Sequence, residues 1–427
     1  TTDKGATVVK DSSNTWRYAD HLDANGQPAA SAVAAGPSKA PPSASTDLKP
    51  SKDRVAAPVD DRAPFAGFTG NQRTVVILAQ FLDLTSRGTT PAQWSQNFFG
   101  ASGSVRSFYK GASFNQLDLV PATETSGTAN DGVIGWVTLP MNHPNTGEDT
   151  STVNQNLTAA AIQAADPFID YAAFDTNGDG YIAPGELHIT VIVAGYETSY
   201  GGTSSCSPSV WGHKWAVASA PTVDGKIVGR LGYTQFGEVH CLASNPAGAH
   251  MATIGIMAHE FGHDLGWTDL YDTSFRTEGI GAWSLMASGS WGTSGGGQQG
   301  NSPTLPDAYS KYLQGWITPT VVNTSGRSVS LSAAATSSQA VLLGVNPGGA
   351  EMGGTGEYFL VENRQPTGLD AALPGCGLLV YHVAETFTNN AGAVSTGRLI
   401  DVEEAGGPQD MDTYPGSRGS ADDPWHT

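Results

Sequence analysis

A short stretch of the 427-residue sequence carries residue types and spacings that suit metal chemistry. His259 and His263 stand four residues apart, so on a helix both imidazoles lie on one face and can reach one ion. Glu260 lies about 100° around that helix from His259, where its carboxylate can touch a water on the ion without becoming a ligand. The spacing predicts a helix that presents two metal ligands and a general base.

The residues after this motif predict a third ligand. Gly266 is expected to end the helix, because glycine adopts the left-handed conformation of a helix C-terminus without a Cβ penalty. The chain can then turn and bring Asp269 back to the ion. Three protein ligands with one open position are typical of a catalytic zinc site. Glu278 is the rival third ligand, but it lies in a Gly-rich stretch without helical pattern, so we favour Asp269.

The alternative is an ordinary helix whose histidines are satisfied by packing. On a helical wheel of about 100° per residue, Ile254, Met257, Phe261 and Leu265 form one apolar stripe, and the two histidines point roughly the opposite way. This pattern favours a helix that packs on one side and faces a cleft on the other.

A second motif, D-x-N-x-D-G-x5-E, runs from Asp175 to Glu186 and matches a calcium-binding loop along its whole length. An Asx-rich surface turn would explain the Asn-Gly and Asp-Gly pairs, but not the glutamate at the last position. The alternating residues Leu187–Val193 after the loop predict a strand, which favours a rigid calcium-stabilised loop over a helix–loop–helix sensor. The expected ligands are the side chains of Asp175, Asn177, Asp179 and Glu186 and the backbone carbonyl of Tyr181.

The overall charge excludes several classes of partner. The sequence has 40 acidic and 21 basic residues, a formal net charge of -19, which argues against binding nucleic acid or an anionic membrane. We find no apolar run long enough for a membrane span, and residues 1–30 lack the basic-then-apolar layout of a signal peptide. For an exported protein, we therefore expect the signal to have been removed from this numbering.

The three cysteines are consistent with an exported bacterial enzyme, as are the low lysine content and the abundant Gly, Ser, Thr and Ala. A disulfide between Cys206 and Cys241 is the preferred pairing, which leaves Cys376 unpaired. Three buried thiols are the alternative.

The sequence divides into three regions, 1–70, 71–317 and 318–427. Residues 1–70 are expected to form a flexible N-terminal segment, since Pro28–Pro64 is rich in Ala, Ser and Pro and has no aromatic residue. This segment is either a linker or the remnant of a propeptide, in which Asp60 or Asp61 could occupy the open zinc position.

The remaining pattern predicts an α+β protein. In region 71–317, we expect strands at Arg73–Phe81, Gln116–Val120 and Gly135–Pro140, and helices at Pro91–Phe99, Ser104–Lys110, Ser151–Ala165 and Pro306–Trp316. Region 318–427 has short alternating runs that predict an antiparallel, β-rich region, with strands at Ser328–Ala333, Gln339–Val345, Glu357–Glu362 and Gly377–Val383.

Several of these stretches resemble the immune inhibitor A family of secreted bacterial metallopeptidases. The similar stretches are Ser104–Val120, Gly135–Pro140, His259–Asp272, Gly279–Trp291, Gly356–Gln365 and Leu399–Asp412. The resemblance implies a metzincin-like zinc peptidase domain with a mixed sheet and an active-site helix, followed by β-rich structure, and secretion as a zymogen. It also implies bound calcium, zinc on His259, His263 and Asp269, and Glu260 as the general base. Trp267-Thr268 departs from the Leu-Pro that members often have before the aspartate.

Zinc peptidases with this extended motif have a tight turn with a methionine beneath the metal, and Met286 is placed for that role. The expected function is a secreted, monomeric zinc endopeptidase that hydrolyses proteins or peptides and does not insert into membranes. One alternative is a non-enzymatic, calcium-stabilised surface or binding protein with a vestigial zinc site. A zinc hydrolase of a non-peptide substrate is another, but it would leave Met286 unexplained.

Overall fold

The computed structural model describes residues 8–10, 16–22, 28–34, 67–149, 152–273, 276–344, 346, 348–391, 397–406, 409–414 and 416–426. The chain divides into two units, Thr1–Val59 and Asp60–Thr427. In the first unit, β1 (Val8–Lys10), β2 (Trp16–Leu22) and β3 (Pro28–Ala34) form an antiparallel sheet in that order. The sequence pattern did not predict this sheet. Asp60 and Asp61 lie outside the described residues.

The second unit is built around an eight-stranded sheet. Its order is β10-β13-β8-β4-β5, with β14 paired to β13, β6 to β4 and β9 to β8. β4, β5, β6, β8, β9 and β13 pair in parallel, whereas β10 and β14 run antiparallel to β13. The strands are β4 (Gly70–Gln80), β5 (Leu117–Pro121), β6 (Val133–Thr138), β8 (His188–Glu197), β9 (Ser209–Val210), β10 (His213–Trp215), β13 (Tyr233–Leu242) and β14 (Asn245–Met251).

The two faces of this sheet pack against different helices. Along β4, Val76 and Leu78 join one hydrophobic cluster, while Val75 and Ile77 join the other, as the alternation of a strand requires. α1 (Pro91–Phe99), α2 (Val105–Ala112) and α4 (Ile254–Asp264) contribute to the first cluster, and α3 (Thr152–Ala165) to the second. Burial on both faces explains why β4 is a continuous apolar run.

Local signals predicted these elements well. The predicted helix Pro91–Phe99 is confirmed with the same bounds, because Pro91 starts it and Thr90 and Gln93 form a capping box. The helices predicted to begin at Ser104 and Ser151 and the strands predicted to begin at Arg73, Gln116 and Gly135 are confirmed with end shifts of up to three residues. With several sheets and few helices, the described residues confirm the α+β class.

A second sheet follows with the order β15-β16-β17-β18-β19. β15 (Thr320–Val322) pairs in parallel with β16 (Val341–Leu343), whereas β17 (Glu357–Arg364), β18 (Gly377–Ala384) and β19 (Ile400–Val402) pair antiparallel. The prediction of a strand at Ser328–Ala333 is wrong. That run is largely exposed, with no apolar surface to cover it, and forms only an isolated bridge between Ala333 and Asn363.

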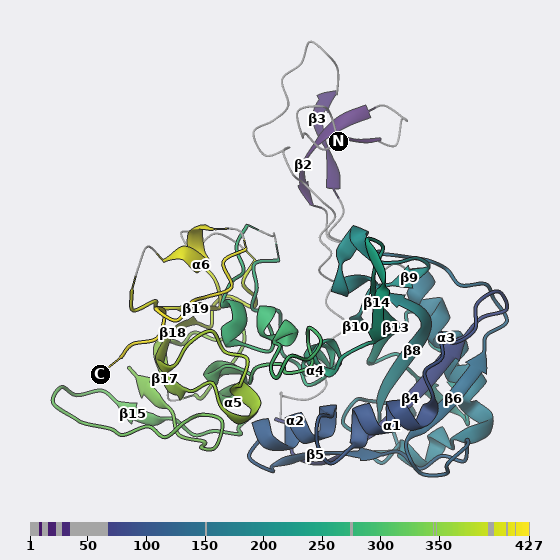
Figure 1. Cartoon of the computed structure of the whole chain (residues 1–427), viewed down its shortest axis with the longest axis horizontal. Coiled ribbons are helices and arrows are strands. Elements are labelled where there is room, and N and C mark those ends of the chain that lie inside the picture. Colours follow the sequence, from purple (N-terminus) through teal and green to yellow (C-terminus); the bar gives the residue numbers. More distant parts are fainter. Residues whose placement is uncertain are drawn as a thin grey trace. The chain divides into compact units, whose positions relative to one another are not determined.

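The second sheet packs against the elements around α4, which lies between the two sheets in Figure 1. Leu360 and Tyr381 belong to the same hydrophobic cluster as Met257 of α4. α5 (Ala308–Leu313) is tied to the second sheet by a buried ion pair of 2.6 Å between Lys311 and Glu362. Its N-cap is Asp307, so Pro306 precedes the cap and does not start the helix.

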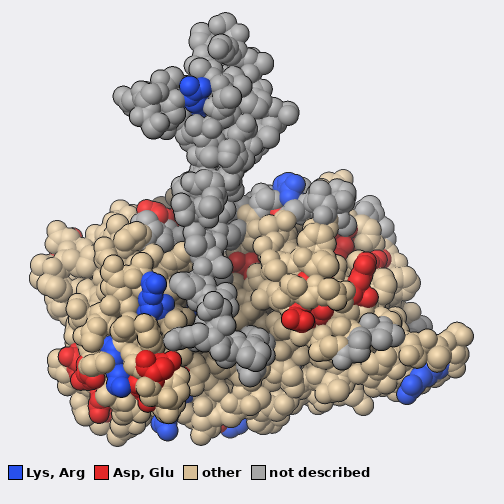
Figure 2. Space-filling model, turned by 180° about the vertical axis from the view of Figure 1, so that it is seen from behind, with Lys and Arg blue, Asp and Glu red and all other residues tan. Residues whose placement is uncertain are grey.

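Surface charge on the face in Figure 2 is sparse. Acidic side chains form small groups there, and Lys and Arg are scattered over mostly uncharged surface. Within the described residues, no helix has the length and apolar character needed to cross a membrane.

Cys206 and Cys241 form a disulfide with a Cα–Cα distance of 5.3 Å, and Cys376 is free and exposed. The bridge spans a sequence separation of 35 residues, so closing this loop should contribute about 3–4 kcal/mol to the free energy of unfolding. We expect Cys206→Ser to lower the denaturant midpoint, and Cys376→Ser, the matched control, to leave it unchanged. Equal midpoints for both variants would contradict a stabilising bridge.

Candidate metal centre and active-site pocket

The two motif histidines lie on α4, and every residue of this helix is buried. The helix ends as the glycine predicts. Gly266 has a φ of +92°, its N–H donates to the carbonyl of His263, and the N–H of Trp267 donates to the carbonyl of Gly262, each at 3.0 Å. These two bonds form a Schellman motif, which turns the chain back toward the histidines.

A close approach beneath the helix explains the glycine inside the motif. A Cβ at Gly262 would lie 2.6 Å from the sulfur of Met286 and 2.8 Å from the ring of Trp267. Met286 is fully buried and therefore packs directly against the helix between the two histidines. The role of Met286 beneath a bound metal stays a prediction.

Three side-chain atoms converge at the end of the turn. Asp269 Oδ1 lies 3.0 Å from His259 Nε2 and 2.9 Å from His263 Nε2, and the two Nε2 atoms are 3.2 Å apart. Tetrahedral zinc with bonds of about 2.0–2.2 Å would place its ligands about 3.3–3.5 Å from one another. The observed triangle is slightly tighter than this spacing, so the three atoms fit a zinc ion with little rearrangement.

Backbone carbonyls orient both imidazoles. His259 Nδ1–H donates to the carbonyl of Leu285 at 2.9 Å, and His263 Nδ1–H donates to the carbonyl of Trp267 at 2.8 Å. In the neutral tautomers that these bonds select, each Nε2 carries a lone pair directed at the other ligands. Three electron-rich atoms in contact repel one another, so this donor set is suited to a cation.

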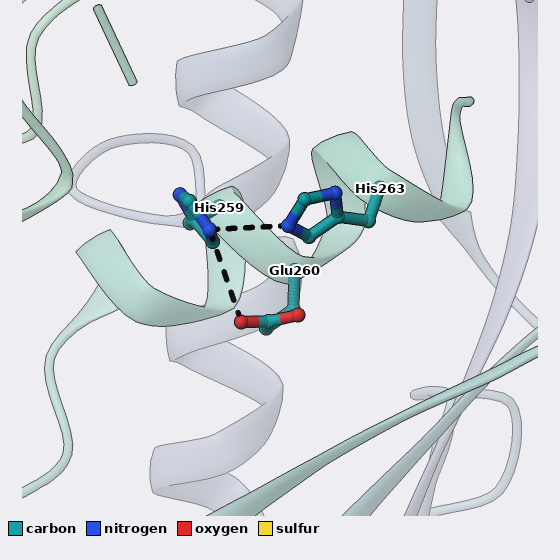
Figure 3. Close-up of side chains that lie close together, drawn as sticks. All are labelled: His259, Glu260 and His263. Carbon is teal, nitrogen blue, oxygen red and sulfur yellow. Dashed lines mark hydrogen bonds and ion pairs between the residues drawn. The ribbon is translucent and has the colours of Figure 1, made fainter. Parts of the chain in front are cut away.

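The pKa of His259 reflects the same demand for positive charge. Burial alone would lower this pKa, but a protonated ring could donate Nε2–H to Asp269 and would be attracted by the carboxylate of Glu260, and these effects outweigh burial and raise the pKa. The nearest Glu260 oxygen, Oε1, lies 4.0 Å from His259 Nε2 (Figure 3), farther than the 3.0 Å between that nitrogen and Asp269 Oδ1. Glu260 therefore faces the centre without belonging to the three-atom donor set.

A pocket of about 270 Å³ opens beside these residues. Its wall includes both His259 and Glu260, so a ligand in the pocket would reach the proposed metal and base. The other lining residues are Ser199, Trp211, Ile256, Tyr271, Asp272, Thr277, Glu278, Ala287, Ser288, Ser290, Trp291, Gly416 and Arg418.

Glu278 lines this pocket, but its carboxylate lies 3.8 Å from the guanidinium of Arg418. Among the described residues, Asp269 is the carboxylate that contacts both histidines.

His213 is a packed histidine, with Nδ1–H bonded to the carbonyl of Trp211 and Nε2 accepting from Tyr233. Sequence reasoning missed Tyr271 and Arg418 as pocket residues. The sequence could have indicated Tyr271 through its position two residues after Asp269, whereas nothing in the sequence pointed to Arg418.

The Asp175–Glu186 loop follows a 3-10 turn (Tyr171–Phe174) and leads through β7 (Tyr181–Ile182) to β8. Asp175 accepts from the N–H groups of Gly178, Asp179 and Gly180, while Asn177 and Asp179 each accept from the N–H two residues later. These bonds gather three of the predicted ligands at one end of the loop.

Two contacts bear on the charge of this loop. Lys226, on β12 (Lys226–Val228), places Nζ 2.6 Å from Asp175 Oδ2, and this ion pair lowers the pKa of Asp175. Glu186 closes the loop by accepting from the N–H groups of Thr176, Asn177 and Ala183. The Glu186 carboxylate thus bonds to the loop backbone, and Tyr181 contributes to β7.

Comparison with known proteins places this site in a family. The catalytic-domain model of the immune inhibitor A peptidase M6 family matches residues 93–317, more than half of the chain. Immune inhibitor A of Bacillus thuringiensis subsp. alesti is 30% identical over 197 residues, 42% of this chain and 28% of that protein. The pre-pro-metalloprotease PrtV of Vibrio cholerae serotype O1 (strain M66-2) is 28% identical over 236 residues, 50% of this chain and 24% of that protein.

The matched part of the chain thus spans about a quarter of the length of these curated relatives. The family match contains α4, the turn at Gly266 and Met286, the elements that gather the three converging atoms. The chain belongs to the immune inhibitor A peptidase M6 family, a family of metallopeptidases.

Proposed function

We propose that this protein is a secreted zinc endopeptidase that hydrolyses peptide bonds of proteins, with His259, His263 and Asp269 as zinc ligands. The observation that carries the proposal is the convergence of the three ligand atoms within 3.2 Å of one another, with Glu260 beside them on the pocket wall. The short path to Asp269 and the buried Met286 also support a metzincin-like site.

In this mechanism a bound zinc ion supplies Lewis-acid chemistry, lowering the pKa of water toward about 7 and polarising the substrate carbonyl. Glu260 receives the proton of the attacking water and gives it to the leaving amine. The carbonyls of Leu285 and Trp267 keep both imidazoles in the tautomer that offers Nε2. Met286 supports the helix from below, so the ligands hold their positions during the reaction.

A non-enzymatic protein with a vestigial zinc site is the second candidate. A vestigial site would have no need of a carboxylate in the place of Glu260, which favours the enzyme. Hydrolysis of casein with a zinc chelator, and again after addition of Zn²⁺, separates the two. The enzyme should lose activity with the chelator and regain it with zinc, whereas the binding protein should release no peptides in either case.

Secretion in a precursor form is also part of the proposal. The Cys206–Cys241 bridge suits an oxidising environment, and the Vibrio relative is named a pre-pro-metalloprotease. Under this proposal, residues 1–70 are the remnant of an inhibitory segment. Deleting residues 1–70 should change the time at which proteolytic activity appears. If that time is the same with and without these residues, this part of the proposal is wrong.

We further propose that the Asp175–Glu186 loop binds calcium weakly. Its oxygen donors stand at the sequence positions that calcium-binding loops use for their ligands. Because Lys226 already offsets part of the charge on Asp175, the calcium affinity should be near the millimolar range of extracellular modules. For a dissociation constant of about 1 mM, 10 mM Ca²⁺ should stabilise the fold by about 1.4 kcal/mol, a rise of about 2 °C in Tm.

Thermal unfolding with and without Ca²⁺ tests this assignment. Asp179→Ala should abolish the calcium-dependent rise in Tm, while Lys226→Gln should strengthen the calcium response. Glu357→Gln, an exposed carboxylate far from the loop in sequence, is the charge-matched control and should respond as the wild type does. A wild-type Tm that is insensitive to Ca²⁺ would contradict calcium binding here.

A further inference from the structure

The active-site pocket carries a cation supplied by the C-terminal part of the chain. Among the described residues that line the pocket, Arg418 is the one Lys or Arg side chain. It lies about a hundred residues beyond the end of the family match at residue 317, so the shared catalytic domain does not account for it. Basic residues are the minority in this sequence, 21 against 40 acidic, so a guanidinium in the pocket indicates a specific role there.

The backbone that carries Arg418 is firmly attached beside the proposed metal centre. The N–H of Ala282 donates to the carbonyl of Arg418 at 2.8 Å, and a Cβ at Gly281 would lie 2.6 Å from the same oxygen. Five residues after Arg418, the buried carboxylate of Asp423 accepts from the indole N–H of Trp283 at 2.9 Å and from the backbone N–H of Ser420 at 2.8 Å. The segment is thus fixed to the loop that leads into Met286.

The Arg418 side chain retains capacity to bind a ligand. Its nearest carboxylate is Glu278, at 3.8 Å, too far for a hydrogen bond, and the guanidinium has no hydrogen-bond partner among the residues that the structure describes. The side chain is 54% exposed, so solvent and ligands can reach it. Arg364, in contrast, is fully buried and bonded to Glu362 and Asp370.

Among the described lining residues, no second Lys or Arg competes with Arg418 for an anion. Asp272 is buried and paired with Arg276, and the remaining neutral side chains include the hydroxyls of Thr277, Ser288 and Ser290. A planar guanidinium binds a carboxylate through two parallel hydrogen bonds. We infer that Arg418 is a specificity-determining residue that binds a carboxylate of the peptide substrate, close to the scissile bond.

This inference rests on the proposed peptidase function. The carboxylate is either the side chain of a substrate Asp or Glu or the free C-terminus of a peptide. Glu278 modulates the preference, because its charge opposes the approach of a second carboxylate to Arg418. Substrates with Lys at the same position gain nothing from Arg418 and are repelled by it.

Matched quenched fluorescent peptides test the inference. A parent peptide that the wild type cleaves is made with Glu, Gln or Lys at each position flanking the scissile bond, and with either a free or an amidated C-terminus. We expect the wild type to favour Glu over Lys at one of these positions, or the free over the amidated terminus, by about three- to tenfold in kcat/KM. A preference for Glu over Lys identifies a substrate side chain as the source of the carboxylate. A preference for the free over the amidated terminus identifies the peptide C-terminus.

Variants of the pocket cation complete the test. Arg418→Gln should remove the preference, Arg418→Glu should invert it, and Glu278→Gln should increase it. Arg327→Gln, which changes the same charge at an exposed position, is the control and should keep the wild-type ratio. Each preference is the ratio of two kcat/KM values measured with the same variant. A change in the amount of folded enzyme affects both values equally and leaves the ratio unchanged.

Two failures can be told apart. If the wild type cleaves none of the peptides, and no casein, the proposed peptidase function is wrong. If the wild type cleaves them and Arg418→Gln and Glu278→Gln keep its Glu-to-Lys and free-to-amidated ratios, the role of Arg418 is overturned while the peptidase function stands.

Discussion

Replacing Glu260 with Gln is expected to lower kcat/KM for casein or a peptide by about 10³–10⁴-fold while the protein keeps its fold and its zinc. The amide has nearly the same shape as the carboxylate but cannot accept the proton of the attacking water. The Glu260 carboxylate lies outside the triangle of His259, His263 and Asp269, so its loss should leave metal affinity intact. Activity assays with metal analysis of the same preparation measure both quantities.

The control for this variant is Glu357→Gln, which makes the same chemical change on an exposed strand position. It should retain wild-type activity and zinc content. A fully active Glu260→Gln enzyme would refute the general-base assignment. An inactive variant that has also lost zinc would instead show that Glu260 is needed to hold the metal.

The second large effect is expected at the third ligand. Asp269→Asn removes the charge that faces both imidazoles, and we expect zinc affinity to fall by more than about 100-fold, beyond the usual cost of changing an outer hydrogen-bond partner. Glu278→Gln should leave zinc content unchanged, because the Glu278 carboxylate lies on the side of Arg418, 3.8 Å from its guanidinium, and does not contact the histidines in the described structure. Titration with a competing chelator gives both affinities.

The outcome separates the two candidates for the third ligand. Loss of zinc in Asp269→Asn alone supports the short path through Gly266. Loss of zinc in Glu278→Gln with retention in Asp269→Asn would require the later glutamate to reach the metal, as in peptidases that take the third ligand from farther along the chain. The 2.9 Å and 3.0 Å contacts of Asp269 are the reason to expect the first result.

Parts of the fold and site governed by local chemistry were predictable from sequence. Pro91 and the Thr90 cap define one helix, and Gly266 ends another because its positive φ disfavours a side chain. The histidine spacing places both imidazoles on one helix face regardless of the rest of the fold. These features depend on a few neighbouring residues, so the sequence alone reveals them.

Features that depend on distant segments were not predictable. The carbonyl of Leu285 that orients His259 is a backbone group and leaves no mark in the sequence. Lys226 beside Asp175, and Arg418 in the pocket, are brought in by the tertiary fold across 51 and 140 residues. The parallel pairing of β15 with β16 likewise joins segments that the alternating pattern does not connect.

The most direct test of the zinc-peptidase account is a crystal structure of the purified protein with anomalous diffraction recorded on both sides of the zinc absorption edge. The account predicts one strong zinc peak about 2.0–2.2 Å from His259 Nε2, His263 Nε2 and an Asp269 oxygen, with one position open toward the pocket. No zinc peak at these residues in protein that hydrolyses casein, or a peak ligated by Glu278 in place of Asp269, would contradict it.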